Sequence, residues 1–163
     1  MFNQNLNVTE LRTAYFKLAM IHHPDRGGDL ETMKKVNNAY EFALKNCHNK
    51  EQPIVGDKDK RTYNYQYKQP EESALMEAIS KILTAKLPGV TISLMGNWLW
   101  LTGDTKPSKD AIKALGYRYS STKESWYFHS GKFRSSGRGK ASLSEIASKY
   151  GRYDYDANQR SVN

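Results

Sequence analysis

The sequence predicts a mainly α-helical hairpin at the N-terminus, followed by a small α+β domain with the element order α-β-β-α-β-β. Within residues 1–48, apolar residues recur at helical spacing on both sides of a loop that contains a proline and two glycines. Between residues 90 and 130, short runs of alternating apolar and polar residues flank turn sequences, which is typical of β-hairpins. Hydrophobic residues make up 38% of the 163 residues, and this low share favours two small cores over one large core.

The first helix is expected over residues 7–23. Asn7 can cap its first turn, and Glu10 stands three residues later, which completes a capping-box pattern. Pro24 ends the helix because proline disfavours helical geometry at the residue before it. The apolar side of this helix, which includes one histidine, is formed by Leu11, Tyr15, Leu18 and His22.

A second helix is expected over residues 30–46, with Asp29 as its N-cap. Residues 24–29, with the sequence PDRGGD, form the loop before it. Because a short connection makes two helices neighbours in space, we expect their apolar sides to pack against each other. The apolar side of the second helix is formed by Met33, Val36, Tyr40 and Leu44.

The next segment, residues 49–70, is polar and contains two prolines and a glycine. It shows little periodicity, so we interpret it as a linker. Part of this segment alternates tyrosine with polar residues, at Tyr63, Tyr65 and Tyr67. Such alternation is typical of a strand, so this part could form an edge strand.

The α+β domain is expected over residues 71–130. It begins with a helix over 71–87, which a Pro-Gly pair ends. One hairpin is expected around the Gly-Asn pair at 96–97 and a second around residues 120–124. A short helix that starts after Ser108 lies between the two hairpins.

Residues 131–163 form a basic tail that we expect to be largely mobile, apart from a possible helix in the sequence SLSEIASKY. The chain has a net charge of +8, and half of this excess falls in the tail, where seven Lys and Arg stand against three Asp and Glu. A basic protein favours acidic partners such as nucleic acid. The alternative is that the positive charge binds no partner and only keeps the protein soluble.

The single cysteine, Cys47, cannot form an internal disulfide, which favours a reducing, cytoplasmic environment. The N-terminus lacks the apolar core of a signal peptide, and no segment reaches the roughly 18 apolar residues of a membrane span. We therefore expect a soluble chain without a membrane partner. Paired zinc ligands, phosphate-binding loops and nucleophile motifs are absent from the sequence. We expect no metal, no cofactor, no catalytic residue and no enzymatic activity.

The tripeptide His23-Pro24-Asp25 lies in the loop between the two predicted helices. A charged side chain on a rigid turn suits a weak, fast electrostatic contact with a partner. In isolation, this tripeptide more often marks an ordinary turn. Its setting, ELRTAYFKLAMIHHPDRGGDLETMKKVNNAYEFAL, resembles the J-domain family along most of its length. The form HPDRGGD resembles the compact J-domains carried by viruses and mobile elements, which would place the chain in a host cytoplasm.

The resemblance implies a co-chaperone. A J-domain docks on ATP-bound Hsp70 and stimulates ATP hydrolysis, which closes Hsp70 on its client. By the same resemblance, Asp25 is the anion that engages a basic site on Hsp70, Pro24 ends the helix before it, and His23 braces the turn. The basic side chains that would meet an acidic Hsp70 surface are Arg12, Lys17 and Arg26. The C-terminal domain would then choose a client, which the sequence does not name.

The chain departs from the family pattern in two places. Residues 1–6 are too few for the helix that usually precedes the hairpin, and Phe2 and Leu6 would cover the hairpin as an extended segment instead. Phe16 and Ile21 stand where the family often has Arg or Lys. The Hsp70 contact would therefore be weaker, or tuned to one particular Hsp70.

A second hypothesis makes the chain a nucleic-acid-binding accessory protein. Aromatic side chains interleaved with basic residues can stack on bases and clamp a single strand. A small domain also needs large side chains in its core, and this interpretation stays open beside the first. The sequence WLWLTGDT…KALGYRYSSTKESWYF resembles a module of uncharacterised phage and plasmid proteins, which implies no activity. The candidate nucleic-acid-binding residues are Trp98, Trp100, Trp126, Lys132, Arg134, Arg138 and Lys140.

Overall fold

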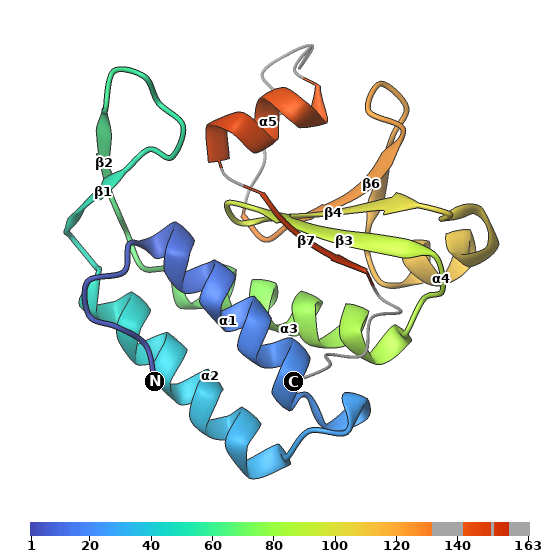
Figure 1. The fold of residues 1–163 in the computed structure, drawn as a ribbon, viewed down its shortest axis with the longest axis horizontal. Coiled ribbons are helices and arrows are strands. Elements are labelled where there is room, and N and C mark those ends of the chain that lie inside the picture. Colours follow the sequence, from blue (N-terminus) through green and yellow to red (C-terminus); the bar gives the residue numbers. More distant parts are fainter. Residues whose placement is uncertain (132–141, 151, 157–163) are drawn as a thin grey trace.

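The computed structural model describes residues 1–131, 142–150 and 152–156. The helices of residues 8–46 and 69–85 lie on one side of a five-stranded antiparallel sheet, and α5 (Leu143–Tyr150) lies on the other side (Figure 1). The expected arrangement of N-terminal helices followed by an α+β region is confirmed, and the helices and strands of residues 69–129 come in the predicted order.

The N-terminal hairpin follows its local sequence signals closely. Helix α1 (Val8–His22) begins with the predicted capping box, in which Asn7 and Glu10 each accept a backbone hydrogen bond from the other residue. Helix α2 (Leu30–Asn46) begins at Asp29, whose carboxylate accepts a backbone N–H in the first turn. The two helices run antiparallel, side by side (Figure 1).

Aromatic side chains join the two helices. The rings of Tyr15 and Tyr40 stack with their centroids 4.2 Å apart. The ring of Phe2 lies 6.0 Å from that of Tyr40, and Phe2 and Leu6 both pack against the core. The N-terminal segment therefore covers the hairpin without forming a helix, as expected, but a turn at residues 4–5 interrupts its extended course.

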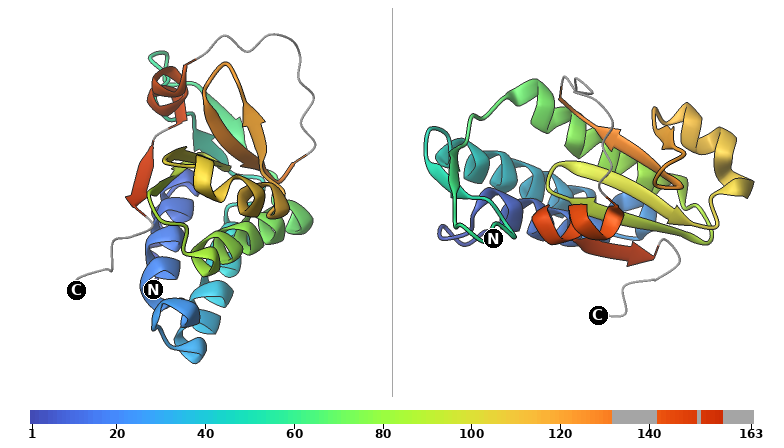
Figure 2. Two further views of the ribbon diagram at one scale, coloured as in Figure 1. Left: turned by 90° about the vertical axis from the view of Figure 1, so that its right-hand side faces the viewer. Right: turned by 90° about the horizontal axis from the view of Figure 1, so that it is seen from above.

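The segment interpreted as a linker is folded onto the helices. Strands β1 (Glu51–Pro53) and β2 (Thr62–Asn64) pair antiparallel and stand beside the start of α1 (Figure 2). The side chain of Gln52 accepts a hydrogen bond from the backbone N–H of Val8 at 3.0 Å. Tyr65 is buried in the core. The segment thus holds the start of α1 in place.

Helix α3 (Gln69–Ala85) begins and ends two residues earlier than its periodicity indicates. Pro70 falls in the first turn, where a missing N–H costs nothing because no partner exists for it there. Lys86 adopts a left-handed backbone conformation with φ of 48°, which ends the helix.

The buried apolar side chains, apart from Met95 and Trp100, form one contiguous cluster that runs from α1 and α2 through α3 to the sheet. The expectation of two small cores is therefore wrong. The physical reason is that α3 contacts α1, while its buried side chains belong to the same cluster as those of the sheet, so the hairpin and the α+β region share one interior.

The five-stranded sheet contains both predicted hairpins, one around residues 96–97 and the other around residues 121–124. A 3-10 turn (Lys106–Ser108) leads into the short helix between them. The elements of this part are β3 (Val90–Met95), β4 (Trp98–Gly103), α4 (Lys109–Ala114), β5 (Arg118–Ser120), β6 (Ser125–His129) and β7 (Tyr153–Asp156). The strand order is β5-β6-β4-β3-β7.

The C-terminal region adds two elements. Helix α5 matches the predicted helix in SLSEIASKY. Strand β7 was not predicted, and it pairs antiparallel with β3 at the edge of the sheet. Within the described ranges, no helix is both long enough and apolar enough to cross a membrane.

Candidate functional site: the HPD turn

The HPD turn, residues 23–28, connects α1 to α2 at one end of the hairpin. His23 has an extended backbone, and Pro24–Arg26 then form a single 3-10 turn. The backbone N–H of Asp25 donates to Nδ1 of His23 at 3.3 Å. Gly27 closes the turn with a left-handed backbone (φ +87°) and an N–H bonded to the carbonyl of Pro24. The proline and the imidazole together hold Asp25 in a fixed place.

The imidazole of His23 is buried and has partners on both nitrogens. Its Nε2 lies 2.8 Å from the hydroxyl oxygen of Ser80 in α3. Because Nδ1 accepts a backbone N–H, we assign the ring proton to Nε2, which then donates to Ser80. Burial lowers the pKa of His23 below its ordinary value, although the charge of Asp25 acts in the opposite direction.

We expect the His23 imidazole to titrate below pH 6.5, and an NMR titration of the ring nitrogens checks this. Protonation makes Nδ1 a donor and breaks the bond from Asp25. Because the pKa is lowered in the folded state, the stabilisation is complete above pH 6.5 and is lost as the pH falls through the folded value. A ring that titrates above 6.5 would contradict the assigned tautomer and burial.

The Asp25 carboxylate lies at the surface, with its side chain 51% exposed. One of its oxygens, Oδ2, accepts a hydrogen bond from the hydroxyl of Thr84 in α3 at 2.7 Å. The same oxygen lies 3.9 Å from Nδ1 of His23. The charge is thus presented to solvent, but α3 contacts it from the side.

Gly28 allows the chain to return past the end of α1. A Cβ at this position would lie 2.2 Å from the carbonyl carbon and oxygen of His22, which are backbone atoms that cannot rotate away. At Gly27, in contrast, a Cβ would meet no heavy atom within 4 Å, and only the positive φ constrains the residue.

Gly28→Ala is therefore expected to lower the free energy of unfolding by about 1–3 kcal/mol, since the turn must shift away from α1. Gly27→Asn should change it by less than about 1 kcal/mol, because Asn tolerates the left-handed region. Urea denaturation of both variants measures the difference. Equal stability of Gly28→Ala and the wild type would show that the turn is looser than the close approach indicates.

The predicted basic contact residues have three different environments. Lys17 is exposed, and its ammonium lies 4.7 Å from the ring centroid of Tyr153 in β7. Arg26 is half-buried beside Asp25. Arg12 is buried, which corrects the expectation that it lies on an exposed basic face.

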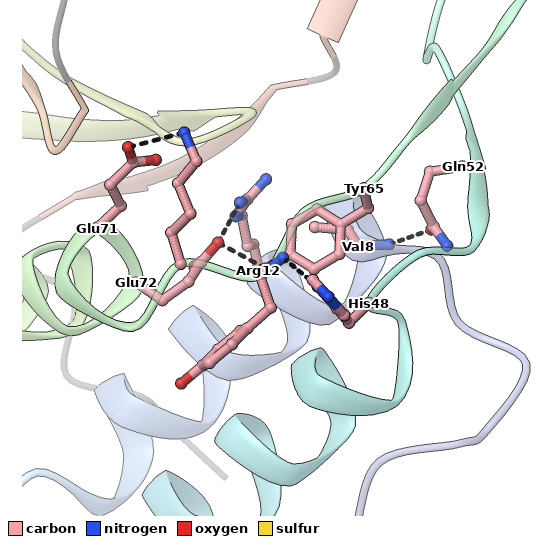
Figure 3. Close-up of polar contacts among 9 residues, drawn as sticks. Val8, Arg12, His48, Gln52, Tyr65, Glu71 and Glu72 are labelled. Atoms are coloured by element: carbon pink, nitrogen blue, oxygen red, sulfur yellow. Dashed lines mark hydrogen bonds and ion pairs between the residues drawn. The ribbon is translucent and has the colours of Figure 1, made fainter.

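Arg12 is buried because it pairs with Glu72 of α3, and the two charges lie 2.6 Å apart (Figure 3). The hydroxyl of Tyr65 donates to the same Glu72 oxygen at 2.8 Å. Burial disfavours the charged guanidinium, but the nearby Glu72 outweighs it and raises the pKa of Arg12. The pair joins α1, α3 and the segment before α3, and so it fixes α3 against the hairpin.

The candidate nucleic-acid-binding residues are not all brought together. Trp98 and Trp100 lie on the sheet face that points away from α1, α2 and α3, with their rings 6.0 Å apart. Trp98 is half-buried, whereas Trp100 is buried with only 4% of its surface exposed. Trp126 pairs with Leu101 across the ladder, so it lies on the other face, where it is buried in the core. Lys132, Arg134, Arg138 and Lys140 lie outside the described residues.

Two aromatic rings that sequence reasoning did not select complete the face with Trp98 and Trp100. Tyr127 and His129 of β6 stand opposite Trp100 and Trp98 in the register. The ring centroids of Trp98 and His129 are 4.3 Å apart, and those of Trp100 and Tyr127 are 5.4 Å apart. We call these four side chains the aromatic face. The strand alternation of β6 was the signal that could have found them.

Ser80 and Thr84 are the site residues that sequence reasoning had no basis to select. They are four residues apart on α3, a spacing that places them on one side of the helix. Two hydroxyls on the polar side of an amphipathic helix carry no recognisable signal. Within the described ranges, no group of three or more His, Cys, Asp and Glu side chains could hold a metal ion.

Comparison with known proteins gives one curated relative, the DnaJ protein ERDJ7 of Oryza sativa subsp. japonica. It is 38% identical over 73 residues, which cover 42% of this chain and 20% of the relative. The chain therefore matches about a fifth of that protein's length. No protein-family model and no solved structure matches the chain. The similarity supports a DnaJ-like region in part of the chain.

Proposed function

We propose that this chain is a J-domain co-chaperone, which stimulates the ATPase of an Hsp70 partner and directs it to a client through the C-terminal region. The observation that carries this proposal is the half-exposed carboxylate of Asp25, held on a proline-bounded turn between two antiparallel helices. The partial similarity to a DnaJ protein supports it.

In this function the chain contributes binding and no covalent chemistry. The Asp25 carboxylate engages a cationic group of Hsp70, and its exposure keeps the cost of desolvation small before contact. Pro24 and the His23 imidazole fix the carboxylate beforehand, so that little conformational entropy is lost on binding. Arg26 supplies positive charge beside the turn, and the exposed Lys17, whose ammonium lies over the ring of Tyr153, supplies it farther along α1, for an acidic surface of the partner. The single cysteine fits a cytoplasmic site of action.

A binding experiment that compares nucleotide states tests the proposal. The chain is immobilised, and Hsp70 proteins, DnaK among them, are passed over it with ATP or with ADP. We expect binding to the ATP-bound form and much weaker binding to the ADP-bound form, with a decrease at higher salt. Equal binding in the two states, or none to any Hsp70 tested, would count against a co-chaperone.

A second candidate function is single-stranded nucleic-acid binding by the aromatic face, and the three partly exposed rings of Trp98, Tyr127 and His129, packed around the buried Trp100, favour it. Arg118 of β5 stands opposite Tyr127 in the register, where it could contact a phosphate. Fluorescence anisotropy with a labelled single-stranded oligonucleotide measures this. Tyr127→Ala should weaken binding by about 1–3 kcal/mol, whereas Tyr119→Ala, on the other sheet face, should not. Absence of binding at low salt would exclude this function.

A further inference from the structure

We propose that helix α3 is part of the HPD site and acts on it in two opposite ways: Ser80 positions His23, and Thr84 competes with the Hsp70 partner for the Asp25 carboxylate. This inference rests on the proposed function and concerns the regulation of the same turn. It is carried by two hydrogen bonds that connect α3 to the turn, one to each of these side chains.

The contact with Thr84 occupies a group that the partner needs. The hydroxyl donates to Oδ2 of Asp25 at 2.7 Å, and Thr84 is itself exposed, so the bond lies at the surface. A planar guanidinium binds a carboxylate through both oxygens at once, and an ammonium also gains from an oxygen with free lone pairs. A partner cation that contacts both carboxylate oxygens must therefore displace the Thr84 hydroxyl or share Oδ2 with it.

The contact with Ser80 has the opposite consequence. The imidazole of His23 is buried, and its Nε2–H has Ser80 as its acceptor. Without that acceptor the ring would keep a buried donor unsatisfied, which costs more than the bond itself contributes. The ring would then reorient, and its bond to the backbone of Asp25 would weaken. Ser80 is thus a positioning residue for the turn that presents Asp25.

Both hydroxyls belong to a helix that cannot easily move away. The buried pair of Glu72 with Arg12 fixes the first turn of α3. The apolar side of the helix is anchored in the core by Leu75, Ile79, Ile82 and Leu83, each 1% exposed. Release of Asp25 therefore requires a rotation of the Thr84 side chain, or of Asp25 itself, rather than departure of the helix.

Three single variants of the full chain separate these roles. Thr84→Val keeps the shape and removes the hydroxyl, and it should tighten binding of ATP-bound Hsp70 by about three- to tenfold. Ser80→Ala should weaken binding by a similar factor, and Ser80→Thr, which keeps a hydroxyl, should restore it. Lys81→Ala is the matched control, since Lys81 lies on the same helix in an exposed ion pair with Glu77.

The double variant Thr84→Val with Asp25→Asn, compared with each single variant, allows this inference and the proposed function to fail separately. In the Asp25→Asn background Thr84→Val should not restore binding, because the carboxylate for which the two groups compete is gone. If Asp25→Asn abolishes binding but Thr84→Val leaves the wild-type affinity unchanged or weakens it, the competition is refuted and the proposed function stands. If Asp25→Asn binds as the wild type does, the proposed function itself fails.

Discussion

Asp25→Asn is expected to abolish stimulation of the Hsp70 ATPase in a single-turnover assay. The substitution removes the negative charge but keeps an oxygen that can accept the hydrogen bond from Thr84, so the turn should retain its shape. Removing one member of a close charge pair between proteins costs about 2–5 kcal/mol, and this corresponds to at least a thirtyfold loss of affinity.

Glu31→Gln is the matched control for the loss of one charge near the turn. Glu31 lies in the first turn of α2, its side chain is 70% exposed, and it pairs only with Lys34 among the ion pairs that the described residues form. Exposed pairs of this kind contribute little, so stimulation should stay close to the wild-type level. Stimulation by Asp25→Asn at the level of Glu31→Gln would refute the role of this carboxylate.

Glu72→Ala is expected to lower the free energy of unfolding by about 3–5 kcal/mol, because it leaves the buried guanidinium of Arg12 without its counter-charge. Urea denaturation followed by tryptophan fluorescence measures this loss. Glu77→Ala, on the same helix in an exposed pair with Lys81, should cost less than about 1 kcal/mol.

A double variant separates the charge effect from the loss of contact. Arg12→Met with Glu72→Leu replaces the pair by apolar side chains of similar volume, a change that is often neutral or stabilising. We expect it to recover most of the stability that Glu72→Ala loses. If Glu72→Ala were as stable as Glu77→Ala, the ion pair between Arg12 and Glu72 would not be the contact that holds α3 against α1.

The parts of the fold that depend on short-range signals could be predicted from the sequence. The capping box of Asn7 and Glu10 and the N-cap at Asp29 determine the starts of the first two helices. The Gly-Asn turn at residues 96–97 determines the first hairpin. In each case the residues that decide the structure lie within about four positions of one another, so that local chemistry is sufficient.

The parts that depend on contacts distant in sequence could not be predicted. From the sequence alone, Arg12 is expected to be an exposed cation. Its burial depends on the ion pair with Glu72, which lies 60 residues later in the chain. Thr84 reaches Asp25 over 59 residues, and nothing in the sequence near Thr84 indicates that contact. Strand β7 has only four residues, and its pairing with β3 depends on an edge that another part of the chain provides.

The aromatic residues show the same division between local and distant contacts. Strand alternation correctly placed Trp98 and Trp100 on one face of β4, because the period of two is a property of one strand. It could not place Trp126 relative to them, since that depends on the register between β4 and β6. In the sheet, Trp126 stands opposite Leu101 and therefore faces the helices.

An NMR titration of the isotope-labelled chain with ATP-bound DnaK tests the central claim most directly, because it reports every backbone amide at once. We expect the largest changes on the amides of His23, Asp25 and Arg26, and we expect Thr84 to change with them as its bond to Asp25 is displaced. Changes confined to the aromatic face of β4 and β6, with the turn unaffected, would contradict it.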